Sequence, residues 1–216
     1  MLKPTPFFIL LVCFILLPVS CLAAAGPLSG RIIVLDPGHG GTEDGAVANG
    51  VREADVNLAV GLKLRDRLAA AGAAVVMTRT ADRSVASPGS ALPAELQARV
   101  DLSRAADADI FISIHANSHF KPETAGVITF YPPERPTELA RAIQEGLVGQ
   151  TGAVDKKIRP ANFYVLRNSE IPAVLVETGF LTNQEEARKL ADCAYQEAIA
   201  EGICQGVVRY FSSRER

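Results

Sequence analysis

Three polar residues of this sequence stand where parallel strands would end. His39 and His115 each follow a short apolar run, and Glu177 ends a third run of the same kind. Side chains just beyond the carboxyl ends of parallel strands meet in one crevice at the edge of the sheet. We therefore expect these three residues, distant in the sequence, to converge on one site.

A fourth group, Glu53, stands at the start of a predicted helix, which would point its side chain toward the same edge. Two histidines and one glutamate form the ligand set of several catalytic zinc sites, which keep one position open for water. Zinc lowers the pKa of that water to roughly 7 and polarises a substrate carbonyl. The pattern predicts Zn²⁺ held by His39, Glu53 and His115, with Glu177 moving protons without binding the metal.

Each of these residues taken singly also has an ordinary structural interpretation. A histidine after a strand is often a satisfied polar residue, and Glu53 is a first-turn glutamate of the kind that the helix dipole favours. If all four residues had only such structural roles, several ionisable groups would be buried at one edge of the sheet without partners, which is energetically costly. His119 falls in a predicted loop, and we interpret it as a surface or substrate-lining residue.

The glycines around His39 have two interpretations. Gly38, Gly40 and Gly41 could form a phosphate-binding loop, but neither GxGxxG nor GxxxxGK occurs in the sequence. We expect them instead to let the backbone turn sharply around His39.

The elements that must position these residues alternate between strand and helix. Short apolar runs predict strands, and apolar residues at helical spacing predict helices. This order is typical of an α/β fold: a single domain with a central, mostly parallel sheet and helices on both faces. Residues 84–93 are predicted to form a surface loop. The predicted strands are residues 31–36, 73–77, 109–114, 126–131 and 173–176, and the predicted helices are residues 53–71, 94–106, 137–150, a segment opening at 183, and 195–211.

Residues 1–25 differ from the rest, with a short basic start, an apolar stretch over residues 7–17 and small residues at 23–25. This layout is typical of a secretory signal peptide cleaved after Ala25. Two alternatives stay open: lipidation at Cys21, or an uncut membrane anchor. All three predict an exported protein that acts in the cell envelope, outside the cytoplasmic membrane. The catalytic domain is predicted to span residues 30–212.

The composition is that of a globular protein, with 48% hydrophobic and 21% charged residues among 216. A formal net charge of −2, no tryptophan and 6% aromatic residues argue against a nucleic-acid partner. Cys193 and Cys204 fall in or near a predicted helix, about 16 Å apart along its axis, so we expect buried thiols and no disulfide between them.

Four segments resemble, in order, the motifs of the zinc-dependent N-acetylmuramoyl-L-alanine amidases of the amidase-3 family. The resemblance spans roughly residues 30–211 and implies His39, Glu53 and His115 as zinc ligands and Glu177 as the catalytic glutamate. The implied substrate is peptidoglycan, at the amide that joins the lactyl group of N-acetylmuramic acid to L-alanine. The segments are Asp36-Pro-Gly-His-Gly-Gly41, Arg52-Glu-Ala-Asp-Val-Asn57, Ser113-Ile-His-Ala-Asn117 and Val176-Glu-Thr-Gly-Phe180.

The resemblance has further implications. The short link from His115 to Gly126 leaves no room for the inhibitory helix of regulated members, and the layout is similar to that of short amidases acting on spore cortex. We expect a monomer that meets the membrane only through its N-terminal segment, if that segment is kept or lipidated. Arg79 and Arg167 are candidate contacts for peptide carboxylates, or partners in internal salt bridges.

Two other classes remain open from the sequence. One is a wall-binding protein that has lost catalysis, although all four expected site residues are present. The other is a different zinc hydrolase, either a peptidase or a sugar deacetylase.

Overall fold

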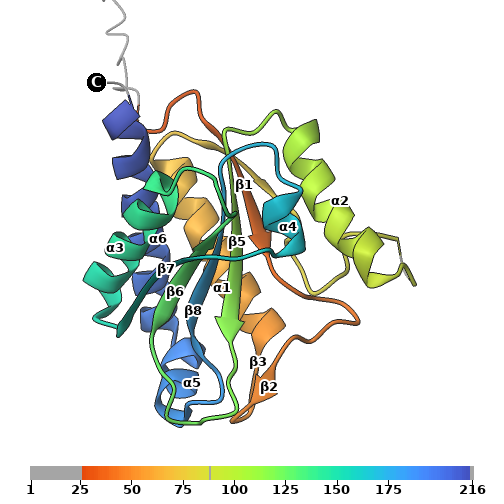
Figure 1. The fold of residues 1–216 in the computed structure, drawn as a ribbon, viewed down its shortest axis with the longest axis vertical. Coiled ribbons are helices and arrows are strands. Elements are labelled where there is room, and N and C mark those ends of the chain that lie inside the picture. The colour runs from red at the N-terminus through yellow and green to blue at the C-terminus, as the bar shows by residue number, and fades with distance from the viewer. Residues whose placement is uncertain (1–25, 88, 215–216) are drawn as a thin grey trace, which may run out of the picture.

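A six-stranded sheet forms the centre of the computed structural model, which describes residues 26–87 and 89–214 (Figure 1). The strand order is β4-β1-β5-β8-β6-β7, and a separate two-stranded ribbon pairs β2 with β3. The first four strands of this order are mutually parallel, while β6 runs antiparallel to β8 and parallel to β7. The strands are β1 (Ile32–Pro37), β2 (Val47–Ala48), β3 (Val51–Arg52), β4 (Ala74–Met77), β5 (Ile110–Asn117), β6 (Val127–Tyr131), β7 (Asp155–Pro160) and β8 (Ala173–Phe180).

Helices cover both faces of the sheet, which is why the central strands read as continuous apolar runs. One face packs against α1, α3, α5 and α6, and the other against α2 and α4 (Figure 1). The predicted fold class, an α/β domain with a mostly parallel sheet, is confirmed. The helices are α1 (Glu53–Ala70), α2 (Leu92–Ala105), α3 (Glu138–Thr151), α4 (Tyr164–Arg167), α5 (Gln184–Ala191) and α6 (Cys193–Arg214).

Glycines let α3 and α6 approach each other closely. A Cβ atom added at Gly146 would lie 2.1 Å from the Gly202 carbonyl oxygen, and one added at Gly206 would lie 2.6 Å from the Ala142 carbonyl oxygen. Backbone therefore lies against backbone where the two helices cross, without intervening side chains.

The structure differs from the predicted elements in several places. β2, β3, β7 and α4 were not predicted. β5 and β8 continue past their predicted ends, so that His115 and Glu177 lie inside strands. The last two residues of the predicted loop over residues 84–93 belong to α2, which begins at Leu92. Cys204 is buried as expected, but the prediction for Cys193 is wrong, because it is exposed; both are free thiols.

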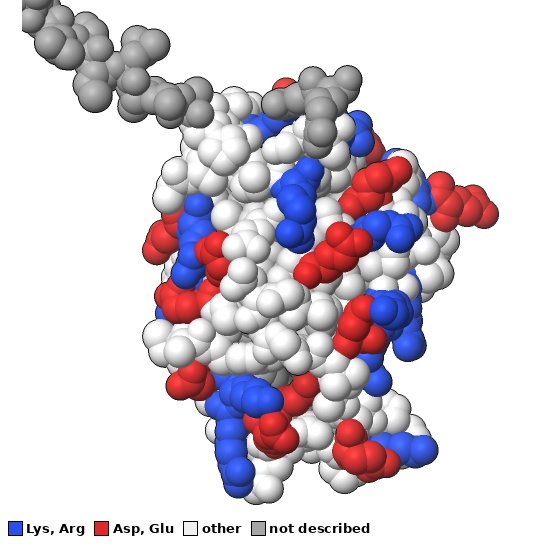
Figure 2. Space-filling view, turned by 90° about the vertical axis from the view of Figure 1, so that its left-hand side faces the viewer, with Lys and Arg blue, Asp and Glu red and all other residues white. Residues whose placement is uncertain are grey.

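The predicted export segment, residues 1–25, lies outside the described residues. Within residues 26–87 and 89–214, no helix has the length and apolar character needed to span a bilayer. On the side of the molecule shown in Figure 2, acidic and basic side chains lie interspersed among uncharged ones.

Candidate active site

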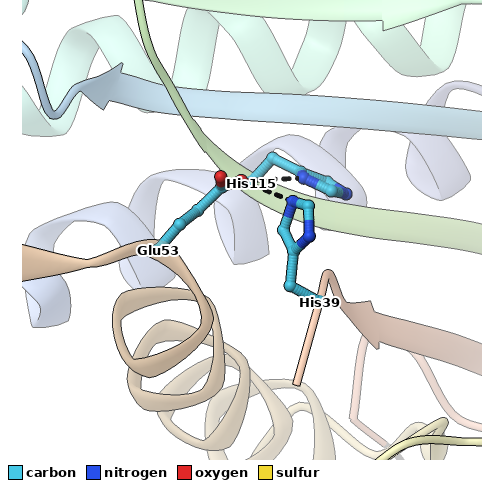
Figure 3. Close-up of side chains that lie close together, drawn as sticks. All are labelled: His39, Glu53 and His115. Atoms are coloured by element: carbon cyan, nitrogen blue, oxygen red, sulfur yellow. Dashed lines mark hydrogen bonds and ion pairs between the residues drawn. The ribbon is translucent and has the colours of Figure 1, made fainter. Parts of the chain in front are cut away.

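His39, Glu53 and His115 meet at the carboxyl end of the parallel strands (Figure 3). His39 lies in the loop after β1, Glu53 is the first residue of α1, and His115 lies within β5. Glu53 Oε1 is 3.2 Å from His39 Nε2 and 3.0 Å from His115 Nδ1. The predicted convergence of these three residues is thus present in the fold.

The chain holds the Glu53 carboxylate in place with backbone donors. The Ala46 amide donates to Oε2 at 2.8 Å, and the Ala116 amide donates to Oε1 at 3.2 Å. Burial would raise the pKa of Glu53, but hydrogen bonds and charges from His115 and His39 outweigh it and hold the pKa well below its ordinary value. Glu53 therefore presents an ionised oxygen to both imidazoles.

Two glycines make room for this cluster. A Cβ atom at Gly38 would lie 2.3 Å from Cε1 and Nε2 of His115. Gly45 has a positive φ of 68°, and a Cβ atom there would lie 2.5 Å from Glu53 Oε2. The backbone therefore passes against the candidate ligands at distances that only glycine allows.

Glu177 lies beside the cluster as the register partner of His115 on the neighbouring parallel strand. Its Oε2 atom is buried and has no hydrogen-bond partner among the described residues. Burial, and to a smaller degree the nearby charge of Glu53, raises the pKa of Glu177 to about 8. A carboxyl group with a pKa near neutrality suits a group that accepts and returns a proton.

The donor set fits a divalent zinc ion. Ligands about 2.0–2.2 Å from a tetrahedral zinc lie about 3.3–3.6 Å from one another. The three candidate ligand atoms all lie within 4.8 Å of one another, and Glu53 Oε1 is already near that spacing from both imidazoles. Small side-chain adjustments would therefore suffice to surround the ion.

A largely apolar cleft adjoins the cluster on the face of the sheet that α2 and α4 cover. His39 and His115 line one part of it, so the candidate metal site opens into the cleft. Phe163 packs edge-to-face against Phe130, with ring centroids 5.2 Å apart. The apolar lining residues are Leu92 and Leu96 of α2, Leu175 of β8, Tyr164 and Val165 of α4, and Phe163, which directly precedes α4. The charged residues Asp36, Glu43, Glu95 and Arg99 also line the cleft.

Other residues that the sequence singled out have structural roles or lie elsewhere. Arg79 is fully buried and binds backbone carbonyls, so the predictions of a substrate contact or a salt bridge do not fit it. Arg167 is exposed and lies over the Tyr164 ring. His119 is half-buried in the loop after β5, where its Nδ1 accepts from the Lys121 amide.

Several site residues were not identified from the sequence. Gly45 and Asn57 both contact Glu53, and the Asn57 amide also donates to the Gly38 carbonyl at 3.2 Å. Arg99, from the middle of α2, reaches the carbonyl of His39. Their residue types are common on surfaces and in turns, so only the fold connects them with the site.

The parallel sheet and the His-Glu-His cluster at its carboxyl end define an α/β domain with a candidate metal-dependent active site. Residues 33–209 match the family described as N-acetylmuramoyl-L-alanine amidase. The chain belongs to this family, and the predicted amidase class is confirmed.

Similar proteins support the assignment. The chain is 38% identical over 196 residues to the germination-specific N-acetylmuramoyl-L-alanine amidase of Bacillus subtilis, with 87% of this chain and 83% of that protein covered. It is 36% identical over 189 residues to the amidase LytC of the same organism; the match covers 86% of this chain but only 36% of LytC. The Clostridioides difficile CwlD amidase, solved in complex with the GerS lipoprotein, superposes with a TM-score of 0.81 at 34% identity, covering 85% of this chain and 99% of that one.

Proposed function

We propose that this amidase hydrolyses the bond between the lactyl group of N-acetylmuramic acid and L-alanine in peptidoglycan, and that it depends on Zn²⁺. His39, Glu53 and His115 are the proposed ligands, and Glu177 is the proposed catalytic carboxylate. The observation that carries the proposal is the meeting of two imidazoles and an ionised carboxylate beside the Glu177 carboxyl group, whose buried Oε2 has no hydrogen-bond partner in the part of the chain that the structure describes.

In the proposed reaction, bound Zn²⁺ supplies a Lewis acid for the substrate carbonyl and makes water acidic enough to attack near pH 7. Glu177 accepts a proton as the water oxygen bonds to the carbonyl carbon. It then delivers that proton to the nitrogen of L-alanine as the C–N bond breaks. The products are an intact glycan carrying a lactyl carboxylate and a peptide with a free amino terminus.

The surroundings of Glu177 suit this proton transfer. In the metal-free chain, burial raises the pKa of Glu177 to about 8, so the ionised carboxylate is a stronger proton acceptor than an exposed one. Oε2 is not held by another protein group among the described residues, so it is free to approach the reacting atoms.

The deciding experiment incubates purified muropeptides with the protein, with and without a chelator, and identifies products by mass spectrometry. Release of peptides beginning with L-alanine, abolished by the chelator and restored by zinc, is the expected result. A metal analysis should find about one zinc per wild-type chain and a strong loss in His115→Ala. No release of stem peptides in the presence of zinc would defeat the proposal.

The same product analysis separates the alternatives. A wall-binding protein without catalysis would leave the muropeptides unchanged. A peptidase would cut within the stem, and a deacetylase would release acetate while leaving stem and glycan joined.

The proposed setting is the cell envelope, with the catalytic domain at residues 30–212 and residues 1–25 acting as signal peptide, lipidation site or anchor. The mass of the protein recovered from the envelope distinguishes the three. Spore cortex is the proposed form of the substrate, because the chain covers most of its germination-specific relative. Faster release from cortex than from vegetative wall would support this. We expect a monomer, which light scattering in solution tests.

A further inference from the structure

The loop that carries His39 is held by two buried guanidinium groups. Arg79 donates from Nε to the Pro37 carbonyl at 2.8 Å and from a terminal nitrogen to the Gly38 carbonyl at 2.9 Å. Arg99 donates to the Pro37 carbonyl at 3.0 Å and to the His39 carbonyl at 2.9 Å. Three consecutive carbonyls, ending with that of the candidate ligand, therefore all accept from arginine.

The guanidinium groups of Arg79 and Arg99 are both buried. Arg79 has no exposed surface, and Arg99 is 3% exposed. Arg99 is compensated by ion pairs with Asp36 at 2.7 Å and Glu95 at 2.8 Å. Among the described residues, Arg79 makes no ion pair, and its hydrogen-bond partners are backbone carbonyls. Burying such a charge is costly unless its donors are well satisfied.

The backbone at His39 needs such support. His39 has a φ of 61°, in the left-handed region that non-glycine residues rarely adopt and that costs on the order of 1 kcal/mol or more. Gly40, with a φ of 114°, leaves the space that Arg79 occupies, because a Cβ atom there would lie 2.8 Å from Arg79 Nε. The loop's turn and the arginine therefore fit each other.

The same two arginines also reach the segments that carry the other candidate ligands. Arg79 donates to the Ala54 carbonyl at 2.7 Å, next to Glu53 at the start of α1. Arg99 reaches β5 through Asp36, which accepts from the Ser113 hydroxyl at 2.7 Å, two residues before His115. All three ligand-bearing segments are thus joined through this pair of guanidinium groups.

We propose that Arg79 and Arg99 are positioning residues for the metal centre: they bind the carbonyls of Pro37, Gly38 and His39 and so aim the His39 imidazole at Glu53 and His115. The inference rests on the proposed function, since it needs a metal at these three residues. It predicts that the arginines set zinc affinity without binding the metal themselves.

The test measures zinc affinity by competition with a chromophoric chelator under conditions in which each variant is fully folded. Lysine keeps the charge of Arg79 but has one nitrogen for several carbonyls. Arg79→Lys and Arg99→Lys should each weaken zinc binding about 10–100-fold, the usual effect of losing a group that orients a ligand. The visible spectrum of the cobalt-substituted protein should change as well, because it reports ligand geometry.

Two controls separate positioning from general stability. Arg104→Lys alters an exposed arginine on the same helix as Arg99 and should leave the zinc affinity unchanged. Leu147→Ala removes a fully buried side chain from α3 and should lower stability without changing zinc affinity. If one arginine variant does not fold, the other still tests the proposal, because both arginines donate to the Pro37 carbonyl.

Wild-type zinc affinity and an unchanged cobalt spectrum in folded arginine variants would overturn the inference. The inference would also be overturned if the arginine variants lost no more zinc affinity than Leu147→Ala at an equal loss of unfolding free energy. Absence of zinc binding by the wild-type protein would instead contradict the proposed function, so the two failures are distinguishable.

Discussion

His115 and Glu177 are register partners on neighbouring parallel strands, β5 and β8. Because partners in a parallel pair project to the same face of the sheet, a candidate metal ligand and the buried carboxyl group are neighbours by backbone geometry alone. The Thr178 hydroxyl, which donates to the His115 carbonyl at 2.9 Å, adds a further link between the strands. The relative position of these two groups is therefore set by the pairing of two central strands of the sheet.

Glu177→Gln should separate metal binding from catalysis. The amide keeps the size of the side chain but cannot accept and return a proton, so we expect amidase activity to fall about 10²–10⁴-fold. Zinc content should stay near that of the wild type, because Glu177 is not a proposed ligand. Activity is measured by release of stem peptides and zinc by metal analysis; a variant that retains most of its activity would contradict the assigned role.

The metal-free protein should lose stability as the pH rises from about 5 to about 8. The pKa of Glu177 is raised to about 8 in the folded protein, against an ordinary value of 4.5, chiefly by burial. Between these values the folded chain holds a proton that the unfolded chain has released, so rising pH favours unfolding by at most about 1.4 kcal/mol per pH unit from this group.

Urea denaturation of the metal-free wild type and Glu177→Gln across this pH range isolates the effect. The difference in unfolding free energy between them should change with pH, because the glutamine variant lacks the titrating group. A constant difference from pH 5 to pH 8 would show that Glu177 titrates near its ordinary pKa.

Gly38→Ala should abolish metal binding. The added methyl group would lie 2.3 Å from the His115 ring, so the imidazole must move away from Glu53. Gly149→Ala is the matched control: it makes the same change on the exposed side of α3, where nothing lies within 4 Å, and should add about 1 kcal/mol of stability. Equal zinc content in the two variants would mean that the loop can adjust around the methyl group.

Gly202→Ala should destabilise the fold and leave the metal centre intact. Its Cβ atom would lie 2.7 Å from the Gly146 carbonyl oxygen, forcing α3 and α6 apart at a cost of about 1–3 kcal/mol. Denaturant titration of the unfolding free energy, compared with Gly149→Ala, measures this cost. A gain in stability like that of the control would show that the helices do not pack as closely as described.

The sequence was sufficient to predict those elements that have a characteristic pattern of apolar residues. Buried strands on a parallel sheet read as apolar runs, so β1, β4, β5, β6 and β8 were all predicted. β7 was missed because it is an edge strand of mostly polar residues, including Lys156 and Lys157, a composition that protects exposed edges. α4 has only four residues, too few to show helical periodicity.

The candidate ligands could be predicted because each stands at the end of a recognisable element. The groups that orient them could not. Arg79 follows β4 and Arg99 lies within α2, and an arginine at either place ordinarily reaches solvent. These two side chains turn inward because α2 and β4 pack around residues 37–39. Packing between segments so far apart in the sequence leaves no local pattern there.

The chain enters the described domain at the end of the sheet opposite the candidate active site. The Leu28 amide donates to the Ala71 carbonyl, just past the last turn of α1, whereas Glu53 is at the first turn of the same helix. A helix of 18 residues separates the two points, about 27 Å. An attachment made at the amino-terminal end of the described domain would therefore leave the candidate active site at the far end, about 27 Å away.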